Sequence, residues 1–268
     1  MPELPEIYHL ARQMDDLLSR KTITQVEVLQ PKCLNVSLEK FRQGLVGARL
    51  LGTRYRGKWV LSETTRDWLL LNLGMGGEIL LVSRAALPEK YRLVFDFDDE
   101  TCLAVNFWWF GYAHVAEREA LDRHTMTAGL GKNAIELENA ELLRLLDGRR
   151  GQVKTFLLDQ NNLAGIGNFY IHDILFLARL HPLRSIPSLS ETDITRLAET
   201  IRSRLQYSIN KGGAEFEVNL LGQKGSFGMQ DLIIGYREGQ PCPECGTPVE
   251  KIKTGGTSSF ICPNCQPL

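Results

Sequence analysis

The sequence lacks a long apolar segment and has almost no net charge. No apolar run approaches the roughly 20 residues of a membrane-spanning helix, and no basic segment followed by an apolar stretch marks a secretory signal at the N-terminus. We therefore expect a cytoplasmic protein without a membrane partner. The formal net charge of −1 gives no overall attraction to a polyanion, so a nucleic acid would have to bind a local basic patch. Repeats and low-complexity tracts are also missing.

The first half of the sequence has the pattern of one helix followed by many strands. Between Leu4 and Leu18, apolar residues recur at spacings of three and four, which predicts a helix with Pro2 and Glu3 at its start. Runs rich in β-branched and large apolar residues then fill residues 20–117, with turn residues between them. This pattern is typical of an antiparallel sandwich or barrel.

The second half has the pattern of helices. The stretch "TAGLGKNAIE" is a candidate linker, and amphipathic segments follow it. The clearest helix begins at Ser190, an N-cap with Asp193 in the acidic position of a capping box, and ends at Gly212 and Gly213. Strands followed by helices, without alternation, indicate an α+β fold.

Four of the six cysteines form a pattern near the C-terminus. Two CxxC pairs, separated by 16 residues, have the spacing of a four-thiolate zinc site. Two disulfides or a redox pair are the alternatives, and a reducing compartment favours zinc. Four protein ligands leave no position for water, so we expect one structural Zn²⁺. The ligands are Cys242, Cys245, Cys262 and Cys265.

The stretch "DQNNLAGIGNFY" reads as two helices joined by a turn that contains Gly165 and Gly167. Glycines let a ligand approach the backbone, and Asn168 at the next helix start would favour an anion. The alternative is a plain glycine-rich connection in which Asn168 only caps the helix.

Several stretches together resemble one family, the formamidopyrimidine-DNA glycosylase and endonuclease VIII repair enzymes. They are, in order, "MPELPE", "GKW", "LGMGG", "FG", "LLDQNNLAGIGNFY" and the terminal cysteine pairs. The resemblance covers nearly the whole chain. It implies a monomeric DNA glycosylase and abasic-site lyase that acts by β/δ-elimination on oxidised or otherwise damaged bases in DNA. It also implies a β-sandwich domain (1–127), a helix-two-turn-helix domain (128–235) and a zinc finger (236–268).

The same resemblance gives the N-terminal motif a chemical role. Two prolines could simply stiffen the entry to a helix. In the family, removal of Met1 exposes the secondary amine of Pro2, which attacks the sugar and forms an iminium. Glu3 would then act as acid and base, and Lys58 would hold the phosphate or sugar beside the lesion.

Further residues match DNA-binding positions of the family. Glu6 and Lys154 fall near the flipped nucleotide, with solvated charges as the alternative. Asn168 would bind backbone phosphate. Asp173 stands where a glutamate is usual, and a surface ion pair is its alternative. Met75 and Phe110 match side chains that fill the space of the flipped base.

The chain departs from the family in two places. Trp108 and Trp109 replace a pair of arginines, so stacking replaces hydrogen bonds to the orphaned base, unless these indoles belong to the core. Near Thr257 or Ser258 the family's phosphate-binding arginine is missing, which weakens positioning on DNA. A non-catalytic or substrate-shifted binder of damaged, crosslinked or single-stranded DNA is therefore the alternative function. The retained Pro2 favours the enzyme.

Overall fold

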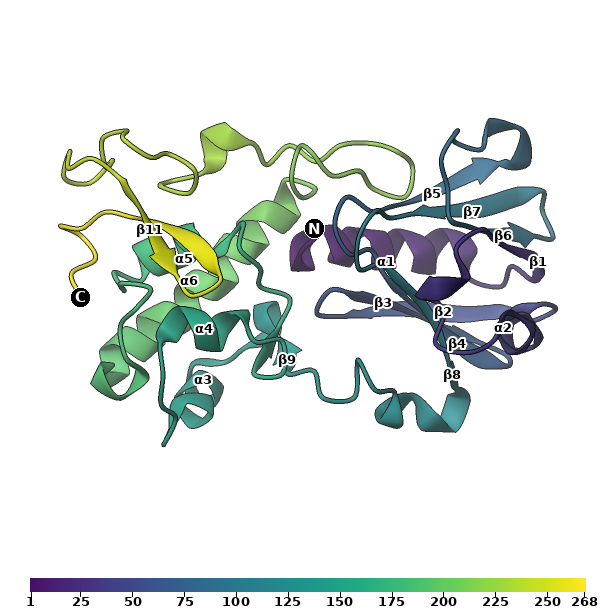
Figure 1. Cartoon of the computed structure of the whole chain (residues 1–268), viewed down its shortest axis with the longest axis horizontal. Helices are drawn as coiled ribbons and strands as arrows, with labels where there is room; N and C mark the ends of the chain where they lie inside the picture. The colour runs from purple at the N-terminus through teal and green to yellow at the C-terminus, as the bar shows by residue number, and fades with distance from the viewer. The chain divides into compact units, whose positions relative to one another are not determined.

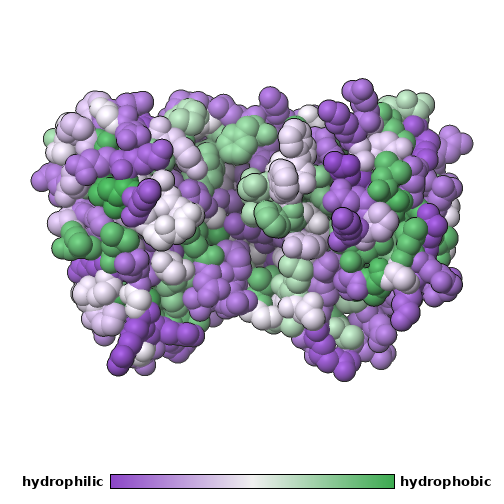
Figure 2. Space-filling model, viewed as in Figure 1, coloured by the Kyte–Doolittle hydropathy of each residue, from purple (hydrophilic) through white to green (hydrophobic).

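The computed structural model describes residues 1–268, which form two compact units. The first unit contains Met1–Gly129 and Gly212–Ser226, and the second contains Leu130–Lys211 and Phe227–Leu268. The first change of unit falls inside the predicted linker, whereas the predicted division into three domains stays a prediction. None of the helices has the length and apolar character needed to cross a membrane. Figure 2 shows hydrophilic residues over much of the visible face of each unit, with hydrophobic residues in scattered groups.

The first unit is built on two antiparallel sheets of four strands each (Figure 1). Their strand orders are β1-β6-β7-β5 and β2-β3-β4-β8. The strands are β1 (Ile23–Val28), β2 (Leu50–Arg56), β3 (Trp59–Thr64), β4 (Asp67–Asn72), β5 (Glu78–Ser83), β6 (Leu93–Phe97), β7 (Thr101–Asn106) and β8 (Tyr112–Glu117).

Two helices complete the first unit. The apolar face of α1 (Leu4–Leu18) packs into one continuous core with both sheets, as the predicted spacing requires. The shorter α2 (Leu38–Leu45) begins at Ser37, whose hydroxyl accepts the backbone N–H of Lys40. Its buried Phe41 joins the same core.

The second unit is mainly helical. Its helices are α3 (Asn139–Leu146), α4 (Val153–Leu158), α5 (Ile171–Leu177) and α6 (Glu191–Asn210). The long α6 packs against α3 and α5. It begins as predicted, because the Ser190 hydroxyl accepts the Asp193 N–H and the Asp193 carboxylate accepts the Ser190 N–H.

Short strands and 3-10 turns make up the rest. The parallel pair β9 (Lys132–Asn133) and β10 (Leu163–Ala164) and the antiparallel hairpin β11 (Glu250–Thr254) and β12 (Thr257–Ile261) both lie in the second unit. The 3-10 turns are Pro31–Cys33, Arg84–Ala86, Arg118–Arg123, Ala134–Glu136, Ile186–Ser188 and Met229–Asp231. The predicted α+β fold is confirmed.

Candidate functional site

The start of α1 holds three of the predicted site residues in buried positions. Pro2 is buried, and Glu3 and Glu6 are only 4% and 6% exposed. One Glu6 oxygen accepts the Glu3 N–H at 2.8 Å, and the other accepts the Ala214 N–H at 3.0 Å. A carboxylate in the first turn also suits the positive end of the helix dipole. Glu6 is therefore fixed beside Glu3. The alternative of a solvated charge is wrong for Glu6, and its place near the flipped nucleotide stays a prediction.

Lys58 reaches the same place from the turn between β2 and β3. Its Nζ lies 3.9 Å from the Met1 sulfur, and its carbonyl accepts the Asn72 side-chain amide at 3.0 Å. Met1 precedes Pro2 directly. The structure thus brings Lys58, which is distant in the sequence, to Pro2 and Glu3 at the N-terminal end of α1.

A third carboxylate at this place, that of Glu217, was not found from the sequence. Its Oε1 lies 3.7 Å from the amine of Met1, and its side chain is only 13% exposed. Burial raises the pKa of Glu217 to about 7, with a smaller contribution from Glu6, although the nearby amine acts in the opposite direction. No motif includes Glu217, so only the fold reveals it.

Four large apolar side chains are exposed on two neighbouring loops of the first unit. The exposed fractions are 45% for Met75, 66% for Trp108, 63% for Trp109 and 69% for Phe110. The Met75 N–H donates to the Trp109 carbonyl at 2.9 Å, and the Trp108 N–H donates to the Met75 carbonyl at 3.3 Å. The loops support each other, and the alternative that the tryptophans belong to the core is wrong.

A glycine makes this loop pairing possible. Gly74 has φ +54°, and a Cβ there would lie 2.0 Å from the Trp109 carbonyl oxygen. Any larger residue would separate the two loops. The exposed aromatic side chains are therefore presented on a closely fitted backbone.

Asn168 lies in the turn that leads into α5. The preceding turn is held by Gln160, whose amide donates to the Ile166 carbonyl and accepts the Gly165 N–H, both at 2.9 Å. Gly165 has φ +109°, which only glycine adopts readily. The Asn168 Oδ1 is buried without a hydrogen-bond partner. The turn with two glycines that the sequence predicts is therefore present, and hydrogen bonds from Gln160 fix its conformation.

Lys154 is buried beneath the β11–β12 hairpin. It is 2% exposed, and its Nζ lies within 3.0 Å of the hydroxyls of Thr254, Thr257 and Ser259 and of the Ser258 carbonyl. Burial lowers the pKa of Lys154 to about 8. Residues at the position of the family's missing arginine thus bind this amine. The alternative of a solvated charge is wrong for Lys154, and its place near the flipped nucleotide stays a prediction.

Asp173 is completely buried and holds the chain after α6 in place. Its carboxylate pairs with Arg204 and accepts the backbone N–H groups of Ile233, Ile234 and Gly235, each at 3.0 Å. Both carboxylate oxygens of Asp173 accept hydrogen bonds. Asp173 therefore has a structural role, and the alternative of a surface ion pair is wrong because the pair is buried. Its match to a DNA-binding position of the family stays a prediction.

The four cysteines near the C-terminus meet at one point. Their sulfur atoms all lie within 4.8 Å of one another, with separations of 3.4 Å, 3.5 Å and 3.8 Å among three of the pairs. Sulfurs around a tetrahedral zinc at about 2.3 Å would be about 3.8 Å apart. The set fits one structural Zn²⁺, as predicted.

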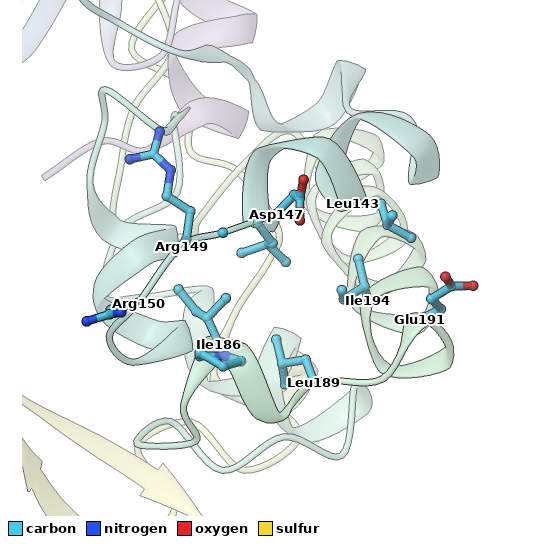
Figure 3. A pocket seen from close by; sticks show the side chains of 11 residues that line it. Leu143, Asp147, Arg149, Arg150, Ile186, Leu189, Glu191 and Ile194 are labelled. Carbon is cyan, nitrogen blue, oxygen red and sulfur yellow. The ribbon is translucent and has the colours of Figure 1, made fainter.

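A further pocket opens beside α3 and the start of α6 (Figure 3). Its lining combines apolar side chains such as Leu143 and Ile194 with Arg149 and Arg150. None of the site residues predicted from the sequence lines it.

Fold and site together define a zinc-containing protein of the DNA-repair glycosylase type. Three family models match successive parts of the chain: the formamidopyrimidine-DNA glycosylase N-terminal domain at residues 1–107, the formamidopyrimidine-DNA glycosylase H2TH domain at 129–219, and the zinc finger found in FPG and IleRS at 239–268. The chain belongs to the formamidopyrimidine-DNA glycosylase family.

Similar proteins agree along the full length. The formamidopyrimidine-DNA glycosylase of Streptococcus mutans is 34% identical and aligns over 99% of each chain, and that of Gluconobacter oxydans is 34% identical over 99% of this chain and all of its own. The Lactococcus lactis Fpg in complex with DNA that contains an abasic site superposes with a TM-score of 0.91 at 26% identity, over 99% of this chain and 100% of that one. The family, the fold, the zinc site and the enzyme class predicted from the sequence are confirmed.

Proposed function

We propose that this protein is a base-excision-repair DNA glycosylase with abasic-site lyase activity, and that the amine of Pro2 is its nucleophile once Met1 has been removed. One observation carries this proposal: in a chain of this family, the N-terminus lies beside the buried carboxylates of Glu3 and Glu6 and the half-buried Lys58. An α-amino group has a pKa near 7.7 to 8.0, so a substantial neutral fraction is present at physiological pH.

The proposed reaction begins with attack by the Pro2 nitrogen on C1′ of the damaged nucleotide. The nitrogen–carbon bond forms as the bond from C1′ to the base breaks, and the base leaves with that electron pair and takes up a proton. The attached Pro2 nitrogen gives its remaining N–H proton to Glu3, and Glu3 passes a proton to the ring oxygen. The nitrogen lone pair then opens the sugar and leaves an iminium between Pro2 and C1′. Loss of a proton from C2′ then expels the 3′ phosphate, and a second elimination expels the 5′ phosphate.

The positions of the other groups support binding of damaged DNA. Lys58 offers an ammonium to the phosphate beside the lesion. The exposed aromatic loops offer stacking surfaces for the space that a flipped base leaves. Asn168 lies at the family's phosphate-binding turn. The Lactococcus lactis structures contain Fpg with DNA carrying an abasic site or an N7-benzyl-Fapy-dG lesion, which supports the same partner here.

We also propose that the protein acts as a monomer in the cytoplasm. One chain carries all three parts that the family models describe. The relatives named above are bacterial, and bacterial DNA lies in the cytoplasm. The alternative of a non-catalytic DNA binder gains no support from these comparisons.

Incision of labelled oligonucleotides tests the activity. The processed protein should cleave a duplex with an abasic site, and a panel of damaged bases would then identify the lesion. Pro2→Gly replaces the secondary amine by a primary one, so we expect a rate at least ten times lower with the fold intact. Equal rates for the two proteins would contradict the role of Pro2.

A further inference from the structure

The segment Gly212–Ser226 is attached along α1, although it follows α6 in the chain. The Ala214 N–H donates to Glu6 at 3.0 Å, and the Leu220 N–H donates to the Gln13 side chain at 2.9 Å. Glu6 and Gln13 are seven residues apart, which places them on one face of the helix. Leu220 is fully buried in the core of the first unit. The segment therefore has a fixed course along α1 between Glu6 and Gln13.

Glycines close the base of this segment. Gly213 has φ +87°, and a Cβ there would lie 3.1 Å from a Glu6 carboxylate oxygen. A Cβ on Gly225 would lie 2.0 Å from the Gly213 carbonyl oxygen. The two ends of the segment thus meet at a distance that larger residues would not allow. Between them, Glu217 is directed to the amino terminus, with its Oε1 3.7 Å from the amine of Met1, the residue that directly precedes Pro2.

Three carboxylates, those of Glu3, Glu6 and Glu217, lie close to one terminal amine, that of Met1. The groups that face Glu217 are the terminal amine and the carboxylates of Glu3 and Glu6, all at the start of α1. Lys58 approaches from the β2–β3 turn, with its Nζ 3.9 Å from the Met1 sulfur. Glu3 and Glu6 occupy fixed places in the capping box. Unlike Glu3 and Glu6, Glu217 takes no part in the capping box of α1, and its carboxylate faces the Met1 amine.

We propose that Glu217, which reaches the amine of Met1 in the unprocessed chain, is the general base that takes a proton from the Pro2 amine once Met1 has been removed, before that amine attacks the sugar. This inference rests on the proposed function, in which the amine is the nucleophile. The step moves one proton: the ammonium becomes a neutral amine with a free lone pair, and the Glu217 carboxylate becomes a neutral carboxylic acid. No other bond changes. Glu217 later returns this proton to solvent.

The proton affinities of the two groups suit such a transfer. Burial raises the pKa of Glu217 to about 7, and an α-amino group has a pKa near 7.7 to 8.0. A general base works best when its pKa is near the working pH, and burial brings the pKa of Glu217 there. A glutamate with its ordinary pKa would be a much weaker base for this amine.

Glu217→Gln tests the inference, because the amide has the same shape and accepts no proton. The rate of borohydride trapping on an abasic-site duplex should be measured from pH 6 to 9 with processed, full-length protein. We expect Glu217→Gln to be about 10 to 100 times slower near pH 7.5, where Glu217 is largely ionised, since general bases commonly contribute at least that much. The difference should shrink towards pH 9, where the amine loses its proton to solvent. Glu217→Asp should restore part of the rate.

Glu215→Gln is the matched control, because Glu215 is exposed on the same segment, and it should leave the rate unchanged. A Glu217→Gln rate equal to that of the control would overturn the inference, and so would a loss of the same size at every pH, which indicates a structural role. Both results would leave the Pro2 nucleophile standing. If the unmodified protein were not trapped at any pH, the proposed function itself would fail, and the inference with it.

Discussion

Removal of the Trp108 indole tests how the protein fills the space of a flipped base. Stacking of a base on an aromatic side chain contributes about 1 to 3 kcal/mol, so Trp108→Ala should raise the Kd for lesion-containing duplex roughly 5- to 150-fold. The side chain is 66% exposed, and substitutions at exposed sites usually change stability by less than about 0.5 kcal/mol. Affinity should therefore fall while the free energy of unfolding hardly changes.

The assay combines binding with single-turnover cleavage of one lesion opposite each of the four bases and in a single strand. An indole stacks on any orphaned base but does not distinguish its edges, so rates should be nearly independent of the opposite base. Trp108→Arg should introduce a preference for cytosine, because a guanidinium donates to its acceptor atoms and such contacts discriminate by about 1 to 3 kcal/mol. Leu29→Ala removes another apolar side chain, 57% exposed, and should change nothing.

Two results would refute this reasoning. A strong preference of the unmodified protein for one opposite base would place discrimination elsewhere in the molecule. Unchanged affinity of Trp108→Ala for every duplex and for the single strand would mean that the indole does not stack on DNA.

Three further predictions concern stability. Asp173→Asn leaves Arg204 buried without its partner and should lower the free energy of unfolding by about 3 to 5 kcal/mol in denaturant titrations; a loss below about 1 kcal/mol would contradict the buried pair. Cys262→Ser or chelation should destabilise the second unit, because zinc binding energy is largely folding energy; metal analysis that finds no zinc in protein purified under reducing conditions would exclude the site. Burial lowers the pKa of His114 to about 4 from 6.5, so the unfolded chain takes up the proton first and stability falls as pH drops from about 6.5 to 4. The difference in His114 pKa corresponds to about 3 kcal/mol of unfolding free energy that is lost over this pH range. His114→Gln should therefore make the stability depend less on pH, as acid titrations of unfolding would show.

The sequence alone predicted those helices and strands that are determined by residues close to one another in the chain. The Ser190 capping box, the apolar spacing of α1 and the turn-bounded strands all depend on neighbouring residues, and the structure contains them. Within the strand-like runs predicted over residues 20–117, the stretch 102–115 differs from the prediction. It is broken between β7 and β8 because the backbone of Trp108 and Trp109 pairs with Met75, far away in the sequence. The helix α2 was missed altogether, because its eight residues give a short signal.

The family motifs located the N-terminal cluster, but they did not predict burial. Lys154 and Asp173 look like surface charges in the sequence, and tertiary contacts with β11–β12 and with residues 233–235 bury both. A signal for Arg204 existed, because it lies three residues after Ile201 on the apolar face of α6. For Glu217 there was none, since its proximity to the amine arises only from the course of the segment after α6.

Identification of the trapped residue tests the central claim most directly. Borohydride reduction during reaction with an abasic-site oligonucleotide, followed by proteolysis and mass spectrometry, locates the bond between protein and DNA. We predict that the DNA is attached to the nitrogen of Pro2 in protein that has lost Met1, and that protein retaining Met1 gives no adduct there. Attachment to a lysine such as Lys58, or equal trapping of the protein that retains Met1, would contradict the account.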